Sequence, residues 1–311
     1  MKKNITFLLL SLSLSLSAYA EDLTVAMMTK SDVPVTPKQQ DEELTSAVFK
    51  LTAAPKLQSA IVLIYDEQGH RPLYTKNAEN IAPIASITKL MTAMVVLDAN
   101  LPMDEKITIS NDDADHRKGT RSRMRAGSTL TRGELLKLAL MASENRAAAA
   151  LARTYPGGTT AALAKMNAKA QELGMRSTRF FDPTGLNSNN VSTAQDLVLM
   201  VRAAQHYQPI HQFTTSTSHT VQLAKHRPLR FNNTNPLVKN ASWDIGISKT
   251  GYISEAGRCL VMQATISKRP VIIVLLDSWG KRTRVGDANR IKKWMESSSS
   301  DRPTRSSRRR G

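Results

Sequence analysis

The sequence predicts an α/β (α+β) domain over residues 56–295, in which strands from both ends of the chain form one sheet and helices lie between them. Three observations support this prediction. A β-rich apolar run occupies residues 60–65, helical spacing of apolar residues dominates the middle of the chain, and runs rich in β-branched residues return after residue 245. Because a sheet and amphipathic helices each bury an apolar face, they are expected to pack as a sandwich.

The first two strands form a predicted hairpin. Residues 60–65 read Ala-Ile-Val-Leu-Ile-Tyr, the turn-forming sequence Asp-Glu-Gln-Gly follows at 66–69, and a second short run begins at Pro72 and ends at Thr75. Apolar runs separated by such a turn are typical of antiparallel strand pairs.

A helix is predicted next, from about Pro83 to Leu97. Leu90, Met94 and Leu97 recur at helical spacing, and good helix formers fill the positions around them. Few of these residues are polar, so we expect the helix to be buried on most of its circumference. Ser86 lies in the first turn of this predicted helix.

The middle of the chain predicts further helices. Thr131 and Glu134 have the spacing of a capping box at the start of an apolar helix. That helix pauses at Ser143–Asn145, and an alanine-rich helix resumes and runs to about Arg153. Another helix is expected to end at about Leu173, before a glycine.

Late runs predict the rest of the sheet. Residues 245–252, 259–266 and 270–276 are almost continuously apolar, as is typical of central strands. A closing helix is expected around residues 288–294. The only cysteine, Cys259, lies inside one of these runs, so an internal disulfide is excluded and a buried structural thiol is expected.

The two ends of the chain predict export and disorder. Two lysines precede a short apolar run, and a small-x-small motif ends at Ala20, so residues 1–20 have the pattern of a secretory signal peptide. The apolar run is too short to span a membrane, and no cysteine follows it, so no stable membrane anchor is expected. We expect a flexible leader over 21–55 and a disordered, arginine-rich tail over 296–311.

The chain is strongly basic, with 43 Lys and Arg against 26 Asp and Glu and a formal net charge of +17. Without the two lysines of the signal peptide the charge of +17 becomes +15. An exported protein meets little nucleic acid, so no nucleic-acid partner is expected. The charge either favours anionic envelope material or serves solubility alone. The sequence does not indicate an oligomeric state.

One candidate nucleophile stands out. Ser86 and Lys89 are three residues apart, so on a helix they share a face and their side chains can meet. A serine hydroxyl needs a base, and a lysine serves as one if burial lowers its pKa enough to leave it neutral. The spacing alone is weak evidence, because Ser278 and Lys281 repeat it next to a strand and a glycine.

Two further motifs each have a structural alternative. Ser143-Glu144-Asn145 lies between predicted helices, where Ser and Asn also cap backbone groups. Lys249-Thr250-Gly251 lies on an apolar strand, where a lysine also protects an exposed edge and a glycine also marks a bulge. A second Ser-x-Asn occurs at 188–190 in a polar loop. The joint occurrence of the three motifs, in this order, favours a catalytic site.

In this order and context the motifs resemble those of penicillin-binding proteins and class A β-lactamases. The chain more narrowly resembles the low-molecular-mass D-alanyl-D-alanine peptidases, especially their endopeptidase subgroup of the penicillin-binding protein 7 type. The resemblance implies a serine β-lactamase/D,D-peptidase-like fold, with a central antiparallel sheet flanked by helices and a mainly helical subdomain. It covers roughly residues 58–295 and rests on the segments 83–94, 140–148, 182–186 and 249–252.

The resemblance also implies the roles of the catalytic residues. Ser86 would attack a D-alanyl carbonyl in peptidoglycan, and Lys89 would accept its proton. Ser143 would pass a proton to the departing amine, coupled to Lys89 and Lys249. Water would then hydrolyse the acyl-enzyme, and β-lactams would acylate the same serine as inhibitors. A periplasmic location follows from the family and the signal peptide.

Substrate binding is assigned by the same resemblance. Asn145 would hold the substrate amide, and Lys249 and Thr250 would bind its carboxylate side. The backbone N–H groups of Ser86 and Tyr252 would bind the oxyanion. A side chain at Gly251 would block the substrate from lying along the strand edge.

Three other functions are considered. A β-lactamase is disfavoured because residues 181–187 contain no glutamate to activate water. A D,D-carboxypeptidase is disfavoured because such enzymes usually carry an added C-terminal β-domain and an amphipathic membrane helix, whereas only 17 residues follow Trp294 in this sequence and they have no apolar face. No metal and no cofactor is expected, since the histidines form no metal-binding helix motif and no glycine-rich phosphate loop is present. A non-catalytic wall-binding protein would use the arginine tail and the basic run of Arg117, Lys118, Arg121, Arg123 and Arg125, but a charge run of this kind is more often a solvated loop.

Overall fold

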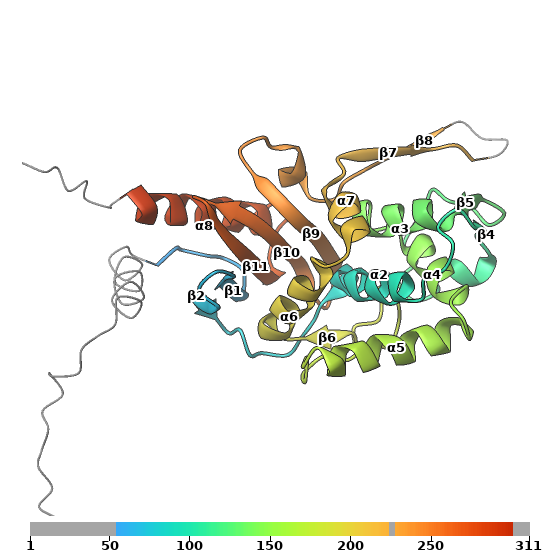
Figure 1. Cartoon of the computed structure of the whole chain (residues 1–311), viewed down its shortest axis with the longest axis horizontal. Helices are drawn as coiled ribbons and strands as arrows, with labels where there is room; N and C mark the ends of the chain where they lie inside the picture. Colours follow the sequence, from blue (N-terminus) through green and yellow to red (C-terminus); the bar gives the residue numbers. More distant parts are fainter. Residues whose placement is uncertain (1–53, 224–227, 301–311) are drawn as a thin grey trace, which may run out of the picture. The chain divides into compact units, whose positions relative to one another are not determined.

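The computed structural model describes residues 54–223 and 228–300. Its main sheet has five strands in the order β2-β1-β11-β10-β9, and every neighbouring pair is antiparallel. The sheet therefore joins the two ends of the domain (Figure 1), as predicted. Its strands are β1 Ile61–Asp66, β2 Arg71–Lys76, β9 Asp244–Ile253, β10 Gly257–Ile266 and β11 Arg269–Ser278.

The central strands are apolar throughout because both faces of the sheet are covered. In β11, Val271 and Ile273 face one hydrophobic core, whereas Ile272 and Val274 face the other. Helix α8 (Thr283–Ser300) covers the first face, and a larger group of helices covers the second (Figure 1). A strand that is buried on both faces does not alternate apolar and polar residues as a half-exposed strand does, which explains the continuous apolar runs in the sequence.

Helix α8 is longer than predicted. It continues to Ser300, so residues 296–300 are helical where a disordered tail was predicted. The physical reason is local: Trp294 is 8% exposed against the sheet, and the hydroxyls of Ser297 and Ser298 donate to its carbonyl oxygen. The predicted signal peptide, nearly all of the leader and the rest of the tail lie outside the described residues.

The helical region is built around one buried helix. Residues 88–96 of α2 are all buried, as its composition predicted. Thr131 and Glu134 form the predicted capping box, with reciprocal bonds between each side chain and the other residue's backbone N–H. The helices are α2 Thr88–Asp98, α3 Arg132–Met141, α4 Asn145–Arg153, α5 Gly158–Glu172, α6 Ala194–Ala204 and α7 Gln208–Thr215.

Small strand pairs surround this core. Strands β7 and β8 form one of these pairs, and α6 and α7 had no counterpart in the sequence prediction. Within the described ranges no helix is long and apolar enough to cross a membrane. The small strands are β3 Ala82–Pro83, β4 Lys106–Thr108, β5 Thr129–Thr131, β6 Val191–Ser192, β7 Ser218–Val221 and β8 Leu229–Asn232, with short 3-10 turns η2 Asn111–Asp113 and η3 Pro236–Lys239.

The position of β9 corrects one prediction. Its apolar sequence predicted a central strand, but β9 is an edge strand of the main sheet. It is nevertheless buried from Ile247 to Gly251 because helix α7 and the 3-10 turn η1 (Ala85–Ile87) pack against it. The open edge of the sheet thus lies beside the start of α2.

Candidate active site

Ser86 lies at the junction of the sheet edge and the helical region. It occupies the 3-10 turn η1, one turn ahead of α2 rather than inside its first α-turn. Ala85 is buried with φ +47°, and Ile87 is also buried, so Ser86 is anchored on both sides. Three residues on, Lys89 is 1% exposed and its Nζ lies 2.8 Å from Ser86 Oγ. The predicted Ser–Lys contact is therefore present.

Lys89 has two other partners. Its Nζ donates to Asn145 Oδ1 at 2.7 Å and to the carbonyl oxygen of Thr184 at 2.6 Å. Burial lowers the pKa of Lys89 to about 7, although Asp182 and Glu144 act to raise it. A neutral amine has two N–H groups and one lone pair. The two oxygens take the two N–H groups, which leaves the lone pair facing the hydroxyl of Ser86.

The Thr184 carbonyl is held in place by a tightly bonded loop. Asp182 accepts from Thr184 Oγ1 at 2.5 Å, from the N–H of Gly185 at 2.9 Å and from Asn190 Nδ2 at 2.8 Å. Gly185 has φ +81°, and a Cβ there would lie 1.9 Å from the carbonyl oxygen of Ala85. Only glycine lets the loop approach the Ser86 turn this closely.

Ser143 and Lys249 form a second polar pair. Ser143 lies between α3 and α4 with φ +59°, a left-handed conformation that is costly for serine. Lys249 Nζ donates to Ser143 Oγ at 2.8 Å and to the carbonyl oxygen of Thr250 at 3.0 Å. Burial lowers the pKa of Lys249 well below its ordinary value, and the charges of Lys89 and Arg284 add to this effect. Among the described residues Ser143 makes no hydrogen bond to Lys89.

The rest of the Lys-Thr-Gly motif lies along the same edge. Thr250 Oγ1 donates to Thr234 Oγ1 at 2.6 Å. A Cβ at Gly251 would meet the Ile84 carbonyl oxygen at 2.9 Å and the Ser86 nitrogen at 3.1 Å. Glycine is thus needed for β9 to pack against the nucleophile turn, a more direct reason than the predicted clearance for substrate. The Tyr252 side chain is 56% exposed and stacks on Arg258.

Arg284 of α8 is a site residue that the sequence prediction missed. Its guanidinium donates to the carbonyl oxygens of Gly251 at 2.7 Å and Cys259 at 3.1 Å, and these two residues are partners on β9 and β10. The Gly251 carbonyl therefore points toward β10. In a trans peptide the next N–H points the opposite way, so the N–H of Tyr252 faces the open edge beside Ser86. No sequence motif surrounds Arg284, because it acts on backbone oxygens.

The alternative motifs have structural roles. Ser278 is buried at the end of β11 and its hydroxyl bonds that of Ser59 at 2.7 Å, whereas Lys281 is exposed. Asn190 is buried and supports the Asp182 loop. Cys259 is a buried thiol, as predicted, and burial raises its pKa to about 11.

Comparison with known proteins agrees with this geometry. The profile of the D-alanyl-D-alanine carboxypeptidase family matches residues 49–280. The chain belongs to this family. The match includes all three motifs and the Asp182 loop, so the resemblance inferred from the motifs is confirmed, and with it the enzyme class.

Relatives within the family are similar over most of their length. The chain is 48% identical to a D-alanyl-D-alanine endopeptidase of Pseudomonas aeruginosa, over 78% of each chain. It is 45% identical to a D-alanyl-D-alanine endopeptidase of Escherichia coli, over 80% of this chain and 83% of the relative.

A solved relative confirms the predicted fold. The crystal structure of a Streptomyces DD-transpeptidase matches with a TM-score of 0.73 and 29% identity, over 78% of this chain and 98% of that one.

Proposed function

We propose that the chain is a periplasmic serine D,D-endopeptidase that hydrolyses D-alanyl cross-links of peptidoglycan through an acyl-enzyme on Ser86. One observation carries the proposal: Lys89, which is buried and has its pKa lowered to about 7, contacts the hydroxyl of Ser86. The endopeptidase names of two relatives that are 45% and 48% identical support the choice of bond.

Acylation begins when Ser86 Oγ attacks the D-alanyl carbonyl carbon and its proton passes to the lone pair of Lys89. The negative charge that develops on the carbonyl oxygen is stabilised by the backbone N–H groups of Ser86 and Tyr252. Arg284 supports this role, since its bond to the Gly251 carbonyl turns the Tyr252 N–H toward the open edge. Arg284 is thus a positioning residue.

The leaving amine needs a proton, and the Ser143–Lys249 pair is placed to supply it. Lys249 bonds Ser143 Oγ, so a proton can move from the ammonium through the hydroxyl to the amine. In deacylation the protons move back: Lys249, then neutral, takes a proton from the attacking water through Ser143, and Lys89 returns its proton to Ser86 Oγ. Lys249 and Thr250 also bind the carboxylate of the leaving group. Asn145 holds the substrate amide: one of its N–H groups is taken by Thr120 Oγ1 at 3.0 Å, which leaves the other for a substrate carbonyl.

Water hydrolyses the acyl-enzyme, and with a β-lactam this step is slow. A class A β-lactamase uses a glutamate carboxylate to activate this water. Asp182 is the nearest candidate on the loop, but its oxygens are occupied by Thr184, Gly185 and Asn190. The absence of a free carboxylate on this loop supports a peptidase that β-lactams acylate and trap.

Purified enzyme acting on cross-linked muropeptides tests the proposal, with products separated by chromatography. We expect dimers to become monomers, and expect both penicillin and Ser86→Ala to abolish the reaction. Labelled penicillin should give one stable adduct on Ser86 by intact-mass analysis. Unchanged dimers in the presence of a functional Ser86 would refute the endopeptidase.

The family description favours a second candidate, removal of a terminal D-alanine by a D,D-carboxypeptidase. The same residues would perform it, because only the leaving group differs. Loss of terminal D-alanine from uncross-linked peptides, with dimers left intact, would establish this activity in place of cross-link cleavage.

A further inference from the structure

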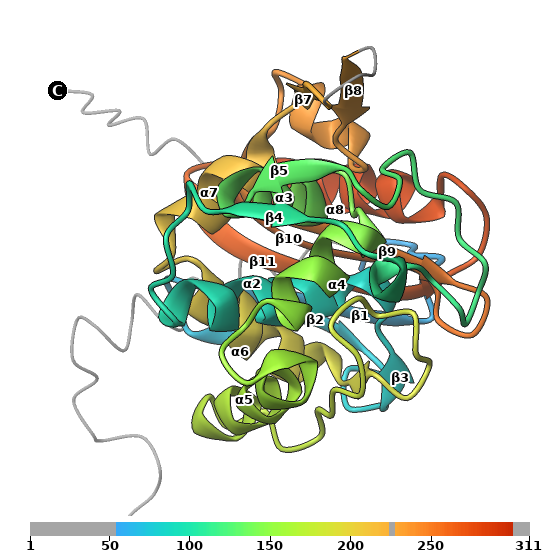
Figure 2. The same cartoon turned by 90° about the vertical axis from the view of Figure 1, so that its right-hand side faces the viewer.

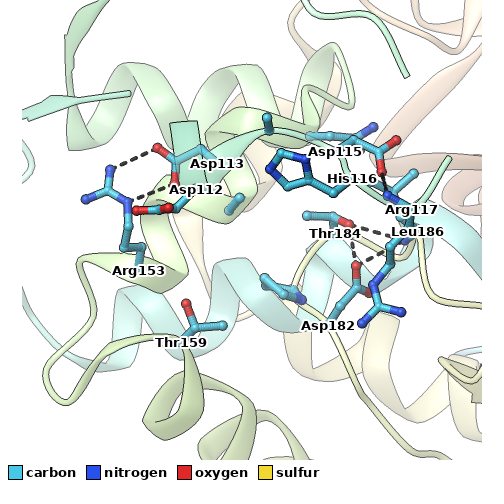
Figure 3. Close-up of a pocket in the computed structure, with 14 residues that line it drawn as sticks. Asp112, Asp113, Asp115, His116, Arg117, Arg153, Thr159, Asp182, Thr184 and Leu186 are labelled. Atoms are coloured by element: carbon cyan, nitrogen blue, oxygen red, sulfur yellow. Dashed lines mark hydrogen bonds and ion pairs between the residues drawn. The ribbon is translucent and has the colours of Figure 1, made fainter. Parts of the chain in front are cut away.

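The helical side and the sheet side of the active site present different groups at the surface. On the helical side, a cavity of about 230 Å³ is lined by carboxylates that are already bonded (Figure 3). Asp113, for example, accepts two hydrogen bonds of 2.9 Å from Arg153. On the sheet side, aromatic rings are exposed instead. Tyr252 is 56% exposed, and Trp279 is the most exposed large apolar side chain within the described ranges, at 84%.

The strand register places these two aromatic residues at the same end of the main sheet. Tyr252 on β9 lies opposite Arg258 on β10, and the Arg258 guanidinium stacks on the Tyr252 ring at 4.4 Å. Arg258 in turn lies opposite Ser278 on β11, the residue before Trp279. Neighbouring strands are about 4.8 Å apart, so Ser278 lies roughly 10 Å from Tyr252 across the sheet. Trp279 therefore lies close to the oxyanion-binding end of β9 but outside the catalytic cluster.

The backbone that carries Trp279 is anchored on both sides. Ser278 is buried, and its hydroxyl bonds that of Ser59 at 2.7 Å. After the ring, the hydroxyl of Thr283 at the start of α8 donates to the carbonyl oxygen of Trp279. A residue on an anchored backbone loses little conformational entropy when it binds a ligand. The exposed indole is thus prepared for recognition rather than carried on a free loop.

The neighbours of Trp279 indicate the class of ligand. Gly280 follows it, and then the exposed side chains of Lys281 and Arg282. The ring therefore does not continue into an apolar surface along its own segment, as a site for a protein hot spot or for lipid insertion would. A flat indole face packs well against the C–H face of a sugar ring, and the cationic side chains can donate hydrogen bonds to hydroxyl and N-acetyl oxygens beside it.

We propose that Trp279 binds the glycan strand of peptidoglycan, with one sugar ring stacked on the indole. The inference rests on the proposed function, because it takes peptidoglycan as the substrate. The distances agree with it. A stem peptide of about four residues spans at most roughly 14 Å when extended, so the sugar that carries the peptide can reach Trp279 while the D-alanyl carbonyl lies beside Tyr252.

Tryptophan fluorescence tests the contact without any turnover. The sequence has three tryptophans, and Trp243 and Trp294 are each 8% exposed, so acrylamide should quench chiefly Trp279. Peptide-free glycan strands added to the purified full chain should protect this fluorescence from acrylamide. Trp279→Phe should remove the quenchable signal, which assigns the protection to Trp279.

Turnover tests whether the contact is used in catalysis. Trp279→Ala should lower kcat/KM about tenfold on cross-links that are still attached to glycan strands. The same variant should cleave cross-linked peptides freed of sugar by an amidase, and react with penicillin, as fast as the unaltered chain. Trp279→Phe should keep most of the activity on the glycan-linked substrate, because its ring can still stack. Ile81→Ala is the matched control, since Ile81 is another exposed apolar residue, at 61%, and should affect neither substrate.

The outcomes separate this inference from the proposed function. A lack of protection by glycan strands, or an equal loss on both substrates in Trp279→Ala, would overturn the glycan contact and leave the endopeptidase intact. Protection by phosphatidylglycerol vesicles and not by glycan strands would also overturn it, in favour of a lipid surface. A chain that cleaves neither substrate would overturn the proposed function, whereas the acrylamide measurement tests the glycan contact independently.

Discussion

The acylation rate of Ser86 should depend on pH through Lys89. Burial lowers the pKa of Lys89 from 10.5 to about 7. Because the neutral amine is the base, the second-order rate of penicillin acylation should rise tenfold per pH unit below about 7 and level off above it. At pH 6 about one tenth of Lys89 is then neutral, whereas a lysine of pKa 10.5 would be neutral in only about 3 of 100,000 molecules.

A variant of Glu144 assigns this titration to Lys89 rather than to Lys249. The charge of Glu144 raises the pKa of Lys89 and is not among the causes that shift Lys249. Glu144→Gln should therefore move the midpoint of the profile to lower pH and leave the plateau rate unchanged. A rate that is flat from pH 5 to about 9, or a midpoint near that of free lysine, would refute Lys89 as a neutral base.

Three further predictions follow from the geometry. Gly251→Ala forces a methyl group to 3.1 Å from the Ser86 nitrogen. This crowding should lower the unfolding free energy by about 1–3 kcal/mol and slow acylation. An unchanged denaturation midpoint would contradict the prediction. Arg284→Met frees the Gly251 carbonyl and should slow acylation at least about tenfold with little change in the apparent penicillin affinity. An equal loss of acylation rate and of apparent affinity would indicate general damage to the site instead. Glu105→Gln leaves the 1%-exposed Arg132 without its charged partner; because Glu105 is half-exposed, denaturation should show a loss of about 1–2 kcal/mol, and no loss would show that Arg132 is neutralised elsewhere.

Local chemistry was readable from the sequence. Ser86 and Lys89 meet because three residues separate them at the start of a helix, and Thr131 and Glu134 cap α3 for the same reason. The antiparallel sheet followed from the family resemblance. Local sequence patterns therefore predict only contacts between residues that lie a few positions apart in the chain.

Long-range contacts were not readable. Thr184 bonds Lys89 through a backbone carbonyl, and Arg284 bonds the backbone of β9 and β10. Neither contact requires a particular neighbouring sequence. The edge position of β9 could not be predicted either. Because η1 packs against β9 and buries it, this strand is as apolar as a central strand.

The loop between β4 and β5 touches both walls of the active site. Thr120 bonds Asn145 on the helical side, and Lys118 forms an ion pair with Glu255 in the β9–β10 turn, beside which the loop runs in Figure 2. These two contacts fasten the loop to the helical side and to the sheet edge of the site at once. The Lys118–Glu255 ion pair is solvent-exposed, so salt weakens it, and the loop is expected to detach from the sheet edge more readily as ionic strength rises.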